Sequence, residues 1–247
     1  MRRIVVFGGS KGIGGVLSDR LLEAGNLVII VSRSCNKRHE NLSFIKADLS
    51  KEMQCKSACE QILALGVPLD GLVFLQRFRG DSSKAWDGEI NTTLLAFKLG
   101  VELLSAALVR GGAIVAVSSN AAKLTTLNQP VGYHMAKAGL EAMVRYYALT
   151  LGSSLIKVNA VALATTIKPE NEEFYRLNPE LVKLYNDIIP LGRMCRAEYA
   201  CEAIEFLLNA AHITGQTINV DGGLGLLMQD SLVKQIAKMD DSVLRHF

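Results

Sequence analysis

The chain has 247 residues, of which 49% are apolar and 21% are charged, and its formal net charge is +3. This length and apolar content permit one large buried core and exclude an intrinsically disordered chain. The nearly balanced charge excludes a basic stripe for nucleic acid and a polybasic membrane anchor. The apolar runs are shorter than the roughly 20 residues of a membrane-spanning helix, and residues 4–7 are too short a run for a signal peptide, so we expect a cytoplasmic protein.

Five cysteines and four histidines are scattered along the chain. No two cysteines have the spacing Cys-x-x-Cys, and the histidines show no spacing typical of metal ligands. We therefore expect free thiols, no disulfide framework and no metal site.

Short β-branched runs alternate with longer helix-like segments from end to end. Nearly continuous Val, Ile and Leu without polar alternation is typical of strands buried on both faces. This rhythm predicts an α/β fold, with a parallel sheet and helices on both of its faces. Strands are expected at residues 4–7, 28–31, 72–75, 114–117, 157–162 and 217–220, and helices at 15–24, 58–65, 92–109, 133–151 and 198–208.

Two segments depart from this rhythm. In residues 166–194, an Asn-Pro-Glu run at 178–180 predicts a helix start, and a Lys-Pro-Glu run at 168–170 predicts a second one. Aromatic residues such as Tyr175 make this excursion a predicted substrate lid, the alternative being a packed crossover without a ligand. Residues 226–247 form a C-terminal extension with helical spacing, which either covers a neighbouring subunit's pocket or is a loosely packed tail.

The first predicted strand runs into a glycine-rich loop, Gly-Gly-Ser-Lys-Gly-Ile-Gly at residues 8–14. Glycines let a backbone approach a diphosphate closely, and a helix N-terminus offers free N–H groups. Such a motif alone is weak evidence for a dinucleotide site. Its position between the first strand and the first helix strengthens that evidence. The expected cofactor contacts are Gly8, Ser10, Lys11, Gly12, Ile13 and Gly14.

The second predicted strand ends at Ser32 and Arg33, where an NAD-binding fold would place an acid on the ribose. Lys11 adds a second positive charge. Two cations without a carboxylate favour the 2′-phosphate of NADP over NAD. The alternative is that both are ordinary solvated charges.

Tyr133 and Lys137 are four residues apart at the start of a predicted helix, so they share one face. An ammonium about 4 Å from a phenol favours the phenolate by about 4 kcal/mol at an effective dielectric of 20. Tyr133 is therefore a candidate acid/base near neutral pH. A Tyr-x-x-x-Lys pair by itself is common, as is a Ser-Ser pair such as Ser118 and Ser119.

In combination these features resemble the short-chain dehydrogenase/reductase family over nearly the whole chain. The resemblance implies one Rossmann-type doubly wound domain over residues 1–247 and carbonyl/alcohol chemistry with a nicotinamide. The stretches that carry it are GGSKGIG, VSRS, Asp48-Leu49, Asn91, AIVAVSSNA, YHMAK, KVNAVA, PLGRM and ITGQTINVDGG.

The resemblance also implies residue roles. Tyr133 would protonate the carbonyl oxygen, and Lys137 would lower its pKa and bind the nicotinamide ribose. Ser119 would polarise the carbonyl, with Ser118 as the fallback because Ser119 precedes Tyr133 by 14 positions, one more than is usual. Asn91 would support a water-linked proton relay.

The resemblance implies contacts at both ends of the cofactor. Asp48 and Leu49 would contact the adenine. The family's Pro-Gly after the sixth strand is Leu-Ala here, at residues 163–164. The contact to the carboxamide is therefore assigned to Thr165 or to Thr166.

Two departures from the family pattern fall together. Phe7 stands in place of a threonine, and residues 74–77, Phe-Leu-Gln-Arg, replace Asn-Asn-Ala-Gly. Because both elements change together, we predict an apolar tie: a contact between apolar side chains that replaces a polar contact between the first and fourth strands. In the same loop, Arg77 and Arg79 are candidate anchors for an anionic substrate, the alternative being solvated or subunit-contact arginines.

The sequence thus predicts an NADPH-dependent reductase that converts a ketone to a secondary alcohol. Its substrate would be a small-molecule or carrier-linked carbonyl compound, either a 3-oxoacyl thioester or a more specialised anionic ketone. We expect no nucleic-acid or membrane partner, and a homodimer or homotetramer formed by the apolar helices at 94–104 and 138–148. The competing hypothesis is a catalytically silent nucleotide-binding protein with a regulatory or scaffolding role.

Overall fold

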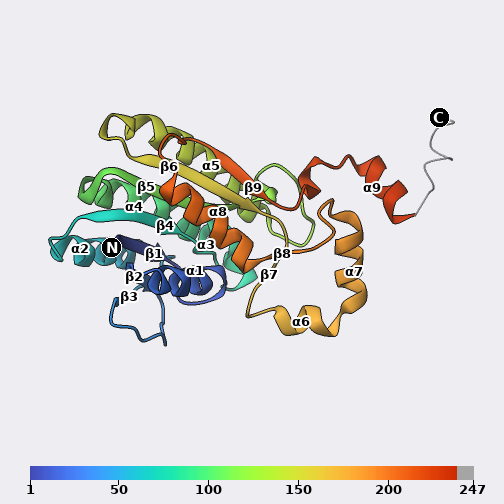
Figure 1. Cartoon of the computed structure of the whole chain (residues 1–247), viewed down its shortest axis with the longest axis horizontal. Helices are drawn as coiled ribbons and strands as arrows, with labels where there is room; N and C mark the ends of the chain where they lie inside the picture. The colour runs from blue at the N-terminus through green and yellow to red at the C-terminus, as the bar shows by residue number, and fades with distance from the viewer. Residues whose placement is uncertain (238–247) are drawn as a thin grey trace.

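Seven parallel strands form one central sheet in a computed structural model that describes residues 1–237 (Figure 1). Their order across the sheet is β3-β2-β1-β4-β5-β6-β9. The strand bounds are β1 Arg3–Phe7, β2 Leu27–Ser32, β3 Leu42–Lys46, β4 Leu69–Phe74, β5 Leu108–Ser119, β6 Lys157–Leu163 and β9 Thr217–Val220.

Helices cover both faces of this sheet. Two helices, α1 and α8, enclose one buried apolar cluster, and three helices, α2, α4 and α5, enclose the other. The predicted doubly wound arrangement is therefore confirmed. The helix bounds are α1 Gly12–Glu23, α2 Glu52–Ala64, α4 Ala96–Leu104, α5 Val131–Thr150 and α8 Ala197–Asn209.

Strand β1 shows why this sheet is buried on both sides. Residues Ile4, Val5, Val6 and Phe7 are at most 1% exposed. Because successive side chains of a strand point to opposite faces, Val5 and Phe7 join the cluster under α2, α4 and α5. Ile4 and Val6 join the cluster under α1 and α8.

Strand β3 was not predicted. It lies at the edge of the sheet, and of its five residues only Ile45 is buried. An edge strand with polar residues and a single buried position lacks the continuous apolar run that identifies the inner strands.

The predicted helix at 92–109 is wrong at both ends. Helical structure begins earlier, with α3 (Ala85–Glu89), and continues through the π-helix η2 (Ile90–Leu95) into α4. After the short turn η3 (Ser105–Ala107), β5 begins at Leu108. The last helical residues and the first strand residues form a nearly unbroken apolar run, in which periodicity does not separate helix from strand.

By length and composition, the helical stretch Ser82–Ala107 could cross a membrane, with a mean hydropathy of 1.2. However, α4 contributes Phe97, Val101 and Leu104 to the core beneath the sheet. A core helix meets the same criterion, so this stretch is weak grounds for a membrane span.

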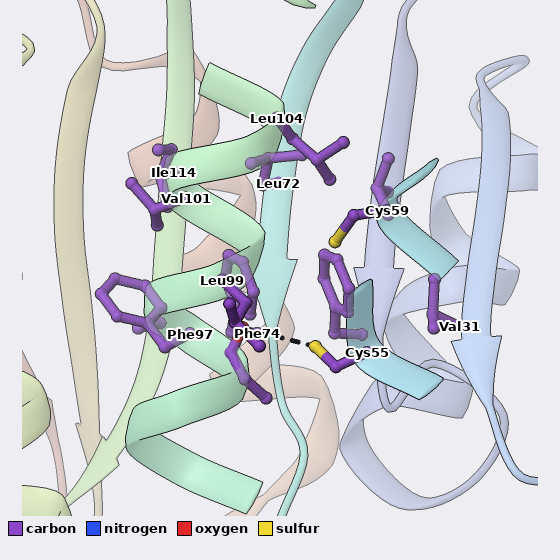
Figure 2. Close-up of a cluster of buried hydrophobic side chains, with 14 of the residues drawn as sticks. Val31, Cys55, Cys59, Leu72, Phe74, Phe97, Leu99, Val101, Leu104 and Ile114 are labelled. Carbon is purple, nitrogen blue, oxygen red and sulfur yellow. Dashed lines mark hydrogen bonds between the residues drawn. The ribbon is translucent and has the colours of Figure 1, made fainter. Parts of the chain in front are cut away.

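The predicted apolar tie between the first and fourth strands is confirmed. Phe7 and Phe74 are register partners, and their rings stack with centroids 4.5 Å apart and planes 4° apart. Figure 2 shows Phe74 in the core beside Phe97, whose ring meets it edge-on. Gly100 of α4 leaves room for this pair, because a Cβ there would lie 2.6 Å from the Phe74 ring.

The excursion at 166–194 is closed at its base by the paired short strands β7 (Thr166–Ile167) and β8 (Cys195–Arg196). It contains α6 (Glu172–Leu177) and α7 (Pro179–Ile188), which lie beyond the carboxyl end of the sheet (Figure 1). The helix start predicted at 178–180 is confirmed.

The helix start predicted at 168–170 is wrong, because α6 begins only at Glu172. Residues 168–171 form a turn instead, in which the side-chain Oδ1 of Asn171 accepts a hydrogen bond from the N–H of Lys168 at 2.8 Å. Of the C-terminal extension, α9 (Gln229–Ile236) lies against α7. Residues 238–247 lie outside the described part.

Candidate active site

A cavity of about 1260 Å³ opens at the carboxyl ends of the strands, between the sheet and the excursion at 166–194. Ligands of open α/β sheets bind at this edge. All the predicted site residues line the cavity except Asn91. Among residues 1–237, no three His, Cys, Asp or Glu side chains gather as metal ligands.

The glycine loop has the shape that a dinucleotide requires. Gly8 has a φ of 80°, and a Cβ there would lie 2.9 Å from the backbone nitrogen of Gln76. A Cβ on Gly14 would lie 2.2 Å from the carbonyl oxygen of Gly8, so the first turn of α1 packs directly on the loop. The first N–H groups of a helix have no partner within it. The amides of residues 12–14 are therefore suited to a diphosphate.

An acidic side chain from the excursion reaches this loop. The carboxylate of Glu170 lies 3.0 Å from the point where a Cβ of Gly12 would be. A negative charge therefore sits where the cofactor's diphosphate is expected. Nothing in the sequence indicated this contact.

Beside the glycine loop, Lys11 and Arg33 are exposed and Ser32 is buried. The Ser32 hydroxyl donates to the carbonyl oxygen of Ser34 at 2.9 Å. Burial raises the pKa of Asp48, but two hydrogen bonds from Ser50 and the charge of Arg33 together bring that pKa below its usual value. Asp48 is thus an anion beside Arg33.

Tyr133 and Lys137 lie on one face of α5, as their spacing predicts, and both are buried. The Lys137 Nζ lies 5.8 Å from the centroid of the Tyr133 ring and donates to the carbonyl oxygen of Val117 at 2.7 Å. Burial lowers the pKa of Lys137 to about 8, an effect that Glu89 opposes and Arg77 reinforces.

The two serines at the end of β5 have different partners. Ser118 is buried, and its hydroxyl donates to Oε1 of Glu141 at 2.9 Å. The Ser119 Oγ accepts from the N–H of Ala121 at 3.2 Å, which leaves its proton available to a ligand. This geometry favours Ser119 as the carbonyl-polarising serine.

Asn91 occupies the π-helix η2, and its carbonyl oxygen accepts the N–H of Ala96. A π-turn of this kind is often found at functional sites. Its neighbour Thr92 lines the cavity, whereas Asn91 does not. The predicted relay role of Asn91 therefore stays a prediction.

Arg77 lies directly against the candidate acid. Its guanidinium carbon is 4.6 Å from the centroid of the Tyr133 ring, and its Nη2 donates to Oε1 of Gln129 at 2.5 Å. Gln129, the buried Glu89 and Lys168 were not predicted, because only the folded chain brings them to Arg77 and Tyr133.

The comparisons with known proteins agree with this geometry. A family model described as "Enoyl-(Acyl carrier protein) reductase" matches residues 8–225. The chain belongs to the short-chain dehydrogenase/reductase family. It is an oxidoreductase of that family. L-xylulose reductase of Bos taurus is 32% identical over 238 residues, which cover 90% of this chain and 96% of the relative.

Two further relatives lie within the same family. Carbonyl reductase family member 4 of Danio rerio is 31% identical, over 92% of this chain and 99% of its own length. A short-chain dehydrogenase family protein from Francisella tularensis has a solved structure with a TM-score of 0.77 and 26% identity, covering 92% of this chain and 100% of that one. The chain therefore shares the fold of this family protein over 92% of its length.

Proposed function

We propose that this short-chain dehydrogenase/reductase uses NADPH to reduce a ketone to a secondary alcohol. The observation that supports this most is that one cavity holds the glycine loop together with Ser119, Tyr133 and Lys137. The names of the relatives, L-xylulose reductase and carbonyl reductase, are consistent with a carbonyl substrate, either a free small molecule or a carrier-linked one.

The glycine loop at residues 8–14 and Lys137 would hold NADPH, which would supply a hydride for the carbonyl carbon. As negative charge develops on the carbonyl oxygen, the Tyr133 hydroxyl gives it a proton and becomes a phenolate. Ser119 donates a hydrogen bond to the same oxygen. The ammonium of Lys137 stabilises the phenolate, and a relay through Asn91 returns the proton to Tyr133.

Tyr133→Phe tests the assignment of the acid. The variant should lose at least about 100-fold in kcat, the lower range for general acid catalysis. Its Kd for NADPH should change little, because only the hydroxyl is removed. Steady-state kinetics on a panel of ketones and a fluorescence titration with NADPH measure the two quantities. A Tyr133→Phe variant that retains turnover would contradict the assignment of Tyr133 as the acid. A wild-type protein that binds NADPH but turns over no ketone would favour the catalytically silent binding protein.

The preference for NADPH rests on Lys11 and Arg33, which line the same cavity as Tyr133. Removing one charge-assisted contact to the 2′-phosphate should weaken NADPH binding by about 10- to 150-fold, since such a contact contributes roughly 1.5–3 kcal/mol. Arg33→Ala should therefore lose NADPH affinity and keep its NADH affinity, as measured by titration following Trp86 fluorescence. Equal losses for both cofactors would contradict the NADP assignment.

A homodimer or homotetramer in the cytoplasm completes the proposal. Three apolar side chains of α5, Met135, Tyr146 and Leu149, are more than half exposed in the single chain. A second copy would bury them. Light scattering coupled to size exclusion measures the assembly directly.

A further inference from the structure

Three cations gather in the cavity on the side of the candidate acid. Arg77 and Arg79 come from the loop after β4, and Lys168 comes from the segment after β6. Burial lowers the pKa of Lys168, the charges of Arg79 and Arg77 lower it further, and the carboxylate of Glu170 partly opposes this shift. The three groups are therefore close enough to repel one another.

No carboxylate forms an ion pair with this cluster, although Glu170 and Glu89 lie close enough to act on its charges. Within the described chain, no carboxylate oxygen comes within 4.0 Å of Arg77, Arg79 or Lys168. The Nε of Arg77 is buried without a hydrogen-bond partner. Burial raises the pKa of the nearby Glu89 carboxyl, and the charges of Arg77, Lys137 and Arg79 only partly offset that shift, which disfavours a full counter-charge there. Arg77 is half-buried and bonded to Gln129 through Nη2, so its buried Nε is the donor that a ligand would complete.

The position of Arg77 limits where the missing anion can lie. Its guanidinium sits 4.6 Å from the Tyr133 ring, and the reacting carbonyl must meet the hydroxyl of that same ring. An anion held by Arg77 is therefore only a few bonds from the carbonyl carbon. A planar carboxylate matches the planar guanidinium at such short range.

We propose that the substrate is a short-chain oxo acid, whose carboxylate is held by Arg77, Arg79 and Lys168 while its ketone faces Tyr133. This inference rests on the proposed reductase function and narrows its substrate. It favours a free acid over an uncharged ester or thioester, in which the carboxyl oxygens carry no charge.

The cofactor's own diphosphate is a second source of anionic oxygens. Lys168 is two residues from Glu170, whose carboxylate lies against Gly12 of the glycine loop. The decisive comparison is therefore made on protein already saturated with NADP⁺, in which the diphosphate site is filled and no turnover occurs.

The experiment is a calorimetric titration of the NADP⁺-loaded protein with acetoacetate and with methyl acetoacetate, in which one added methyl group removes the charge of the carboxyl group. The acid should bind about tenfold more tightly than the ester, a difference of about 1.4 kcal/mol. Arg79→Gln and Lys168→Gln should each remove most of that preference and leave both the ester affinity and the NADPH Kd unchanged. Lys46→Gln, an exposed residue of the edge strand β3, controls for the change in net charge.

Equal affinity for acid and ester, or no binding of the acid to the loaded protein, would overturn the proposal. Acid binding confined to unloaded protein, with weaker NADPH binding in the two variants, would assign the cations to the cofactor and overturn it as well. Failure of the reductase function itself is recognised separately, because wild-type protein would then either bind neither NADP⁺ nor NADPH, or bind NADPH and turn over no ketone.

Discussion

Glu170 places a carboxylate beside Gly12, at the loop where the cofactor's diphosphate is expected. Like charges separated by several ångströms near a protein surface repel by about 1 kcal/mol, and salt screens that repulsion. Glu170→Gln should therefore tighten NADPH binding by about fivefold at low salt, and by less at high salt. Fluorescence titrations at two ionic strengths measure this, with Glu173→Gln, on the same excursion, as the matched control. A weaker affinity in Glu170→Gln would instead mean that Glu170 helps to hold the cofactor.

Residues of the site differ in how far the sequence predicts them. Tyr133 and Lys137 follow from local spacing on one helix, and the glycine loop follows from its place after the first strand. Lys168 and Glu170 could not be predicted, since their neighbours come from strands distant in sequence. Arg77 was identified because its loop follows the fourth strand at the edge of the expected site, and its contact with Tyr133 needed the fold.

At the scale of the elements, the stacked rings of Phe7 and Phe74 join β1 to β4. Phe74→Ala should lower the free energy of unfolding by about 3–5 kcal/mol, the usual cost of truncating a buried phenylalanine. A double-mutant cycle of Phe7→Leu and Phe74→Leu should show a coupling of about 0.5–1.5 kcal/mol. Urea denaturation measures both, with the exposed Phe44→Leu of β3 as control. Additive single effects would mean that the stacking itself contributes nothing.

The elements also show where sequence patterns stop being informative. The inner strands were predicted because both faces are buried and their residues are continuously apolar. β3 was missed because only Ile45 is buried on it, and the helix at 92–109 was misplaced because helix and strand share one apolar run. Both errors fall where burial in the folded protein, rather than local composition, decides the element.

At the scale of the whole molecule, Lys137 makes the stability of the protein depend on pH. Burial lowers the pKa of Lys137 from 10.5 to about 8 in the folded state. Between about pH 8 and pH 10.5 the unfolded chain therefore binds more protons than the folded one, so this residue's contribution to stability rises with pH. Below pH 8 both states are protonated and the cost of burying the charge is fully present.

Lys137→Met removes this titration. Relative to the variant, the wild-type protein should gain about 3 kcal/mol of stability between pH 8 and pH 10.5. Urea denaturation of both proteins at several pH values measures the difference, and Lys137→Gln should give the same trend. A difference that stays constant across this range would show that Lys137 is not held in a buried, charge-disfavouring site.

The order of the strands has a consequence for how the protein is made. β1 emerges first, and β2 and β3 add to one side of it. The sheet then grows only on the other side of β1, through β4, β5, β6 and finally β9. Each new strand must wait for an intervening helix, so the growing chain presents an unpaired edge throughout synthesis. Until the last strand is made, that edge is β6, whose buried residues Val158–Val161 await the four-residue β9. A chain truncated before Thr217 would keep this edge permanently open, and aggregation rather than inactivity would be its first defect.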